Sequence, residues 1–206
     1  MSNRYWISIV AIALAAVLAG VYVARLVSRP AVPALESGTV FPEPRALEPF
    51  ALVDTHGAAA SPATLTGHPT LVFFGFTHCP DVCPTTLTIL SGVQKQVNVP
   101  GLKIALISVD PERDTPEQLG QYISAFKGDL IGLTGDARGV EAASKTFGVA
   151  ASKVDLGGGN YTMDHSAAVF ALDSQARIVA VFTPPFRADV LTRDIAKLAP
   201  ALGARS

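Results

Sequence analysis

The sequence predicts an α/β domain preceded by one N-terminal transmembrane helix. A nearly unbroken apolar run opens the chain, and from Phe50 onward short apolar runs alternate with helical patterns. With 206 residues, 49% of them hydrophobic and 16% charged, the chain can form one globular domain with a full core. The formal net charge of −1 and the lack of any Lys or Arg stripe exclude a nucleic-acid partner.

Residues 6–24 are apolar except for Ser8 and Gly20, which is long enough for a helix to cross a bilayer. Aromatic and basic residues flank the run, as at a membrane interface: Arg4, Tyr5, Tyr22 and Arg25. A cleaved signal peptide is the alternative, but the run is long for one and no small-residue cleavage site follows it. We therefore expect residues 1–27 to be a membrane anchor. Basic residues flank both sides, so they do not orient it.

Residues 28–49 contain five prolines and little periodic apolar pattern, which predicts an extended tether. The domain is then expected over residues 50–199, followed by a tail at 200–206. Within the domain, segments 50–53 and 58–65 flank His56-Gly57 and predict a hairpin.

The continuous apolar runs at 71–76 and 103–109 predict buried central strands, with a one-sided apolar helix over 84–97 between them. Thr115 as a hydroxyl cap, with Pro116 after it, predicts a helix that extends towards Phe126. The remaining elements are expected as strands at 130–133, 167–172 and 178–182 and helices at 136–147 and 188–198. This order resembles a thioredoxin-like fold with an inserted βα element.

The two cysteines, Cys79 and Cys83, follow the first buried strand with three residues between them. A bridge across so short a loop would contribute little to stability, so the pair indicates a redox couple or a soft-metal site. The usual redox motif has two intervening residues, which leaves metal ligation strong. Because prolines follow both cysteines, we expect Pro84 at the first helical position and Cys83 as the cap. The helix amino terminus should then favour thiolates.

A metal site needs a further ligand, and the chain has four histidines. His56 and His68 lie in polar turn contexts typical of the surface, and the ring of His78 should point away from Cys79 because neighbouring side chains alternate in direction. His165 precedes the strand at 167–172, where a thioredoxin-like layout would bring it towards the cysteines. A histidine that only caps this strand is the alternative.

The residues beside His165 have simpler expected roles. Asp164 could orient the ring, and Met163 is expected to pack. A set of two thiolates and one imidazole suits copper, since thiolates select Cu(I) and imidazole binds either copper state. Zinc is the competing metal, but its structural sites normally have four protein ligands. The charged stretch 110–114 is expected to be a solvated loop whose charges partly neutralise one another.

Three motifs resemble the Sco/SenC family of membrane-anchored, thioredoxin-like copper chaperones for cytochrome c oxidase. They are Cys79-Pro80-Asp81-Val82-Cys83-Pro84, the stretch at 108–116 and Asp164-His165-Ser166. The resemblance covers roughly residues 50–198 and is carried by the combination of the three.

The resemblance implies copper binding by Cys79, Cys83 and His165, as Cu(I) or also as Cu(II), with neither state singled out as predominant. It also implies a copper-bearing oxidase subunit as recipient, a thiol reductant, a copper donor protein, and a soluble domain in the periplasm or its mitochondrial equivalent. Such a protein is a metallochaperone rather than an enzyme. The alternative is a periplasmic thiol-disulfide oxidoreductase that uses Cys79 and Cys83 without bound metal.

Overall fold

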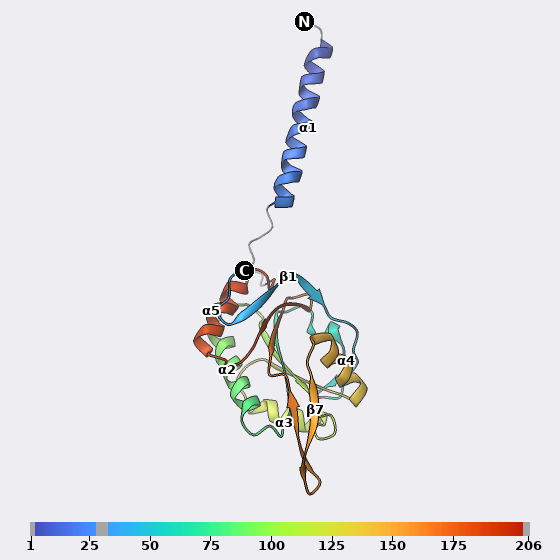
Figure 1. Ribbon diagram of the computed structural model, residues 1–206, viewed down its shortest axis with the longest axis vertical. Helices are drawn as coiled ribbons and strands as arrows, with labels where there is room; N and C mark the ends of the chain where they lie inside the picture. The colour runs from blue at the N-terminus through green and yellow to red at the C-terminus, as the bar shows by residue number, and fades with distance from the viewer. Residues whose placement is uncertain (1–2, 28–32, 204–206) are drawn as a thin grey trace. The chain divides into compact units, whose positions relative to one another are not determined.

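A computed structural model describes residues 3–27 and 33–203, which belong to two separate units (Figure 1). The first unit contains the helix α1 (Asn3–Val27), where the apolar run predicts a helix. Its large apolar side chains, where described, are exposed, Trp6 and Tyr22 among them. Taking only the described residues, we find no helix that is both long and apolar enough to cross a membrane. That description leaves out the side chains of residues 3–5, 8 and 23–27.

The second unit is built on an eight-stranded mixed sheet in the order β1-β10-β9-β4-β5-β6-β2-β3, with a separate β7-β8 hairpin. The main-sheet strands are β1 (Gly38–Ala46), β2 (Leu52–Asp54), β3 (Ala59–Ala60), β4 (Thr70–Gly75), β5 (Lys103–Ser108), β6 (Leu130–Thr134), β9 (Val169–Leu172) and β10 (Arg177–Phe182). The hairpin strands are β7 (Ala151–Gly157) and β8 (Asn160–His165). The helices are α2 (Val82–Gln96), α3 (Pro116–Ser124), α4 (Ala137–Phe147) and α5 (Ala188–Leu198), with a 3₁₀ turn over Pro62–Leu65.

The connections confirm the thioredoxin-like arrangement. Strands β4 and β5 are parallel and joined by α2, while β9 and β10 are antiparallel and lead into α5. Strand β9 pairs with β4, so the two halves form the order β5-β4-β9-β10. Along the chain, β6 and α4 lie between these two halves, and they form the predicted βα insertion. The carboxyl ends of β4, β5 and β6 meet at one edge of the sheet.

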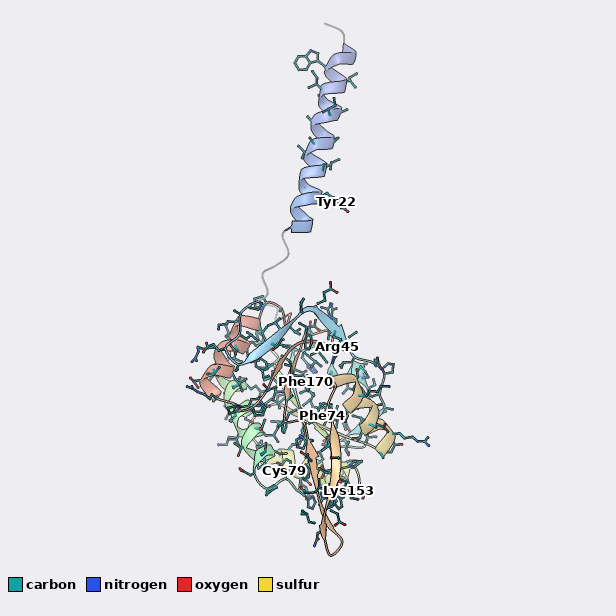
Figure 2. All side chains as sticks on the ribbon, viewed as in Figure 1. Tyr22, Arg45, Phe74, Cys79, Lys153 and Phe170 are labelled. Carbon is teal, nitrogen blue, oxygen red and sulfur yellow. The ribbon has the colours of Figure 1, made fainter. Side chains whose placement is uncertain are left out.

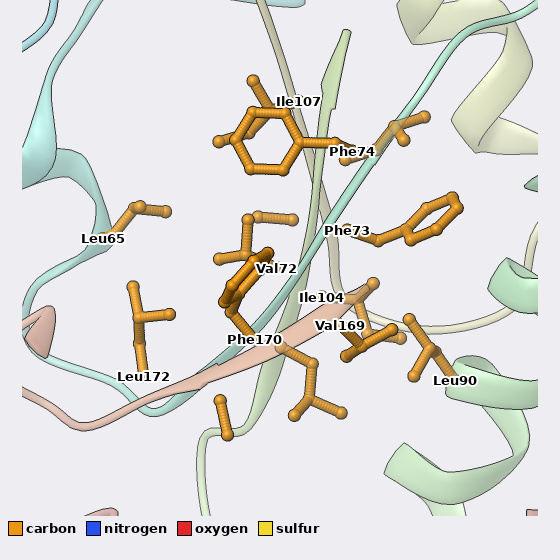
Figure 3. Packing of buried hydrophobic residues seen from close by; sticks show 14 of the residues in the cluster. Leu65, Val72, Phe73, Phe74, Leu90, Ile104, Ile107, Val169, Phe170 and Leu172 are labelled. Atoms are coloured by element: carbon orange, nitrogen blue, oxygen red, sulfur yellow. The ribbon is translucent and has the colours of Figure 1, made fainter. Parts of the chain in front are cut away.

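The core explains why β4 is apolar on both faces. Alternate strand residues point to opposite faces of a sheet. Phe74 packs edge-to-face on Phe147 of α4, with ring centroids 5.2 Å apart, whereas Phe73 lies on the face covered by α2 (Figure 3). Helices α2 and α5 pack against each other. Because helices cover both faces, the central strands are continuous apolar runs, as the sequence indicates.

The predicted tether at 28–49 is wrong for residues 33–49, which belong to the second unit. Residues 38–46 form β1, an edge strand that pairs antiparallel with β10. Pro42 and Pro44 fall between Val40 and Arg45, where the pairing shifts register, so their missing N–H groups interrupt no regular ladder. Residues 28–32 of the predicted tether lie outside the described residues.

The predicted tail at 200–206 also needs correction. Leu202 is fully buried, and its carbonyl accepts a hydrogen bond from the Ser174 amide at 3.1 Å. Residues 200–203 therefore belong to the domain, while residues 204–206 lie outside the described part of the chain. The β7-β8 hairpin is a further difference, because the sequence analysis predicts no strands between α4 and residue 167.

A buried carboxylate fixes the segment that leads into β1. Asp194 of α5 is fully buried and accepts hydrogen bonds from the amides of Glu36 and Ser37 and from the Ser37 hydroxyl, all within 3.0 Å. These contacts join chain segments 157 residues apart. The start of β1 is therefore held against α5.

We expect Asp194→Ala to lower the free energy of unfolding of the full-length chain by about 1–3 kcal/mol, because it leaves buried donors without an acceptor. Urea unfolding followed by circular dichroism measures the change. Asp189→Ala on the same helix removes an exposed ion-pairing carboxylate and should have little effect. An equal loss in both variants would contradict the role assigned to Asp194.

Candidate metal centre

The loop between β4 and α2 carries Cys79 (Figure 2) and is held by the buried carboxylate of Asp114. The amide and the hydroxyl of Thr77 donate to Asp114, the hydroxyl at 2.6 Å. Ser108, at the end of β5, donates to the same carboxylate at 2.6 Å. Burial raises the pKa of Asp114, while the hydrogen bonds from Ser108 and Thr77 act in the opposite direction. Two strand ends are thus joined beneath the cysteine loop.

Helix α2 begins two residues earlier than the sequence predicts. Asp81 is the N-cap and Val82 the first helical residue, so Cys83 lies inside the first turn rather than at the cap. The Cys83 amide, one of the amides that helix geometry leaves without a partner, donates to the Cys79 sulfur at 3.3 Å. The helix start therefore fixes the relative position of the two cysteines.

Cys83 is buried against the end of β4. A β-carbon added at Gly75 would come within 3.0 Å of the Cys83 Sγ, so the glycine permits this close approach. Burial raises the pKa of Cys83 well above its usual range, and the hydrogen bond with Cys79 adds to the shift. For Cys83, burial therefore opposes the preference for thiolate that is expected at the helix start. Cys79 and Cys83 are both free thiols, and Cys79 is partly exposed.

His165, the last residue of β8, is brought to the cysteines from 82 positions further along the chain. Its Nε2 atom lies 3.7 Å from the Cys83 Sγ. Its ring packs edge-to-face on Phe73 and Phe76, with centroid distances of 6.1 Å and 5.9 Å. Burial lowers the pKa of His165, which favours the neutral imidazole that binds metals. The predicted approach of His165 to the cysteine loop agrees with this geometry.

The residues next to His165 in the sequence differ in their burial and in their contacts with its ring. The Nδ1 atom of His165 lies 3.3 Å from the Ser166 carbonyl oxygen, and in the described structure no hydrogen bond joins the ring to Asp164. Asp164 is exposed, and its charge acts on the ring by raising the pKa of His165 against the larger effect of burial. An orienting role for Asp164 stays a prediction. Met163 packs against the core, as expected.

Among the described residues, no hydrogen bond joins the other histidines to Cys79, Cys83 or His165. His78 is exposed and contacts the Thr77 hydroxyl at 3.0 Å, while His68 contacts Thr70 at 2.9 Å. His56 lies exposed in the turn between β2 and β3. Within the described ranges 3–27 and 33–203, no group of three or more His, Cys, Asp or Glu residues is arranged as a metal site. Cys83 and His165 are paired, and Cys79 contacts Cys83.

The charged stretch 110–114 is not the solvated loop that the sequence predicts. Asp110 and Asp114 are 2% and 0% exposed, and Arg113 reaches across to β8. The Arg113 Nε donates to Asp110, while its Nη1 donates to the Tyr161 carbonyl oxygen at 3.0 Å. Sequence reasoning missed these residues because charges that alternate within a loop give no sign of partners elsewhere in the chain.

Comparison with known proteins places this arrangement in a family. A family model described as SCO1/SenC matches residues 41–200. An SCO2-like protein of Rickettsia prowazekii is 34% identical over 154 residues, which cover 73% of each chain.

Two solved structures with copper bound are similar to this chain. ScoI of Bradyrhizobium japonicum has 39% identity and a TM-score of 0.64, covering 77% of this chain and 98% of that one. ScoI of Arabidopsis thaliana has 31% identity and a TM-score of 0.72, covering 75% and 98%.

The unequal burial of the two cysteines predicts unequal reactivity. In the reduced, metal-free, full-length chain, iodoacetamide should modify Cys79 at least about tenfold faster than Cys83, because only thiolates react and Cys83 is held as a buried thiol. Fragmentation mass spectrometry of the peptide that contains both residues gives the two rates. In urea the two cysteines should react alike, and equal rates in the folded protein would contradict the prediction.

Proposed function

Because this chain belongs to the SCO1/SenC family, we propose that it is a membrane-anchored copper metallochaperone. The observation that carries the proposal is the distance of 3.7 Å between the Cys83 Sγ and the His165 Nε2, beside a second cysteine that contacts the first. We infer that Cys79, Cys83 and His165 bind the copper ion. The copper-bound relatives support this choice of metal.

The donor set fits copper better than zinc. Two thiolates and one imidazole are soft and intermediate donors, which suit Cu(I), and the imidazole also suits Cu(II). Zinc structural sites normally have four protein ligands, whereas within the described residues no group of three or more His, Cys, Asp or Glu residues is arranged as a metal site. The neutral state of His165 and the apolar surroundings of Cys83 favour a low-charge complex. We infer Cu(I) as the principal cargo, with Cu(II) as a second state.

The proposed cycle follows from the chemistry of the two thiols. Both thiols lose their protons when copper binds, so uptake releases protons. If Cys79 and Cys83 are oxidised to a disulfide, their sulfurs cannot ligate, and a thiol reductant must reset them. Cys79 is partly exposed and Cys83 is buried, so we infer that Cys79 meets the donor first and that transfer proceeds by ligand exchange through it.

The proposed partners are a copper donor protein and the copper-bearing subunit of cytochrome c oxidase. The support is the resemblance of the three motifs to the family of oxidase copper chaperones, together with the family match over 41–200. Delivery of copper to the oxidase subunit is the role we favour.

Membrane attachment is proposed from the sequence of the first unit. The run at 6–24 has the length and composition of a bilayer-spanning helix, and the exposed apolar side chains of α1 from Trp6 to Tyr22 are suited to contact lipid. We infer a single span, with the domain on the periplasmic side of a bacterial-type membrane or in the mitochondrial equivalent. The support for this side is the placement that the resemblance of the three motifs implies.

A thiol-disulfide oxidoreductase is the second candidate, and the asymmetry of the cysteines is the observation that favours it. The partly exposed Cys79 would attack a substrate disulfide, forming a mixed disulfide and freeing one substrate thiol, and the buried Cys83 would then attack Cys79, forming the Cys79–Cys83 disulfide and freeing the second thiol. Such an enzyme would not need His165. The two functions therefore differ in their dependence on that residue.

We predict that His165→Ala weakens Cu(I) binding by the reduced full-length chain by more than about 100-fold, beyond the range typical of residues that only orient a ligand. Anaerobic competition with a chromophoric Cu(I) chelator measures the affinity. His78→Ala, which removes an exposed histidine next to Cys79, should bind copper as the unmodified chain does. Near-normal binding by His165→Ala would remove this residue from the site. No retained copper, with rapid cycling against a protein disulfide, would favour the oxidoreductase.

We predict that the paired substitutions Leu14→Arg and Leu18→Arg shift the protein from the membrane to the soluble fraction. Each charge at the centre of a spanning helix costs about 2.5–3.5 kcal/mol on insertion scales. Leu14→Ala with Leu18→Ala is the matched control and should stay with the membrane after an alkaline wash. A periplasmic reporter fused after residue 203 tests the orientation, and an inactive reporter on a membrane-bound chain would contradict the proposed side.

A further inference from the structure

Arg113 makes four contacts, two with Tyr161 on the strand that carries His165, one with Asp110 and one with Phe76. Its Nε donates to the carboxylate of Asp110, and its Nη1 donates to the Tyr161 carbonyl oxygen at 3.0 Å. Its Cζ atom lies 3.8 Å from the centroid of the Tyr161 ring and 5.8 Å from that of Phe76. Arg113 therefore contacts both the end of the β4 segment and strand β8.

Arg113 contacts Tyr161 and Phe76, and each of these residues is connected with His165. Tyr161 and His165 are four residues apart on β8, so their side chains lie on the same face of the hairpin. On the other side, the Phe76 ring packs edge-to-face on the His165 ring at 5.9 Å. Arg113 thus holds the strand that presents His165 and one of the rings that orient its imidazole.

A second layer of contacts fixes Tyr161 in the same place. Its hydroxyl donates to Asp110 at 2.9 Å, so one carboxylate accepts from both Arg113 and Tyr161. Lys153 of β7 lies 3.8 Å from the Tyr161 ring centroid and donates to Glu112 at 2.6 Å. Burial and the hydrogen bond to Asp110 raise the pKa of Tyr161 to about 12, so the hydroxyl remains a donor at neutral pH.

We propose that Arg113, with Asp110 and Tyr161, is a positioning device that docks the β7-β8 hairpin and sets the distance from His165 to Cys83. This inference rests on the proposed role of His165 as a copper ligand. Every residue of β7 is exposed, so the hairpin is held through β8, where Met163 and His165 pack on the core beside this cluster. The arginine is the only side chain in the cluster that contacts Asp110, β8 and Phe76 together.

Lysine could not replace arginine in this role. The planar guanidinium donates to Asp110 and to the Tyr161 carbonyl from two nitrogens while its face stacks on the Tyr161 ring. A lysine ammonium keeps the charge but has a single nitrogen and no flat surface. Arg113→Lys therefore removes the docking geometry and preserves the charge.

The test compares Arg113→Lys in the full-length chain with and without His165→Ala. If Arg113 acts through His165, Arg113→Lys should weaken Cu(I) affinity by about tenfold when His165 is present and hardly at all when it is absent. An equal loss in both backgrounds would overturn the proposal, because the effect would then not pass through the histidine. Arg138→Lys, an exposed arginine on α4, is the matched control and should leave the affinity unchanged.

A metal-free measurement separates this proposal from the proposed function. In the reduced chain without copper, Arg113→Lys should speed hydrogen exchange of the β8 amides and shift the His165 ring resonances, because Phe73 and Phe76 would no longer lie against the ring as they do here. Tyr161→Phe keeps the ring and loses the hydroxyl, so it should produce a smaller change in the same direction. Unchanged exchange and resonances in Arg113→Lys would overturn the proposal, even if the chain binds copper well.

Discussion

A single buried residue, Asp114, joins the ends of the three parallel strands that support the candidate site. Its side chain accepts from Ser108 at the end of β5 and from Thr77 just after β4, while its backbone oxygen accepts from Thr134 at the end of β6. Leaving any of these donors without a partner in the interior would be costly. The hydrogen bonds of Asp114 therefore hold the cysteine loop in place. The two cysteines on that loop and at the helix start differ in how far they are buried.

The parts of the fold that could be predicted are those in which burial determines the sequence pattern. Strands β4 and β5 are covered on both faces, so they are unbroken apolar runs, and Thr115 and Asp136 cap their helices as their side chains suggest. Strand β7 could not be predicted in this way because all its side chains are exposed and no apolar alternation records its pairing. Strand β1 could not be predicted because its prolines argue against a strand, and a local pattern cannot show that a strand lies at a sheet edge, where proline is tolerated.

The candidate site likewise contains residues that the sequence identifies and residues that it does not. Cys79, Cys83 and His165 are residue types with distinctive chemistry, so their spacing and context were enough to select them from the sequence. Arg113 and Asp110 were assigned to solvent because their charges balance within a few residues. Their actual partner is Tyr161, 48 positions beyond Arg113, and only the folded hairpin shows it. The protonation of Cys83 likewise depends on burial, which no local motif reports.

The prolines of β1 have a consequence for how the protein behaves among its neighbours. A strand at the edge of a sheet exposes backbone groups that can template the addition of a strand from another molecule. Pro42 and Pro44 each lack an amide hydrogen, and the strand shifts register around them. An approaching chain would find neither a continuous row of donors nor a straight edge. Pro42 and Pro44, which prevent the prediction of β1 from the sequence, should therefore protect the sheet against self-association into aggregates.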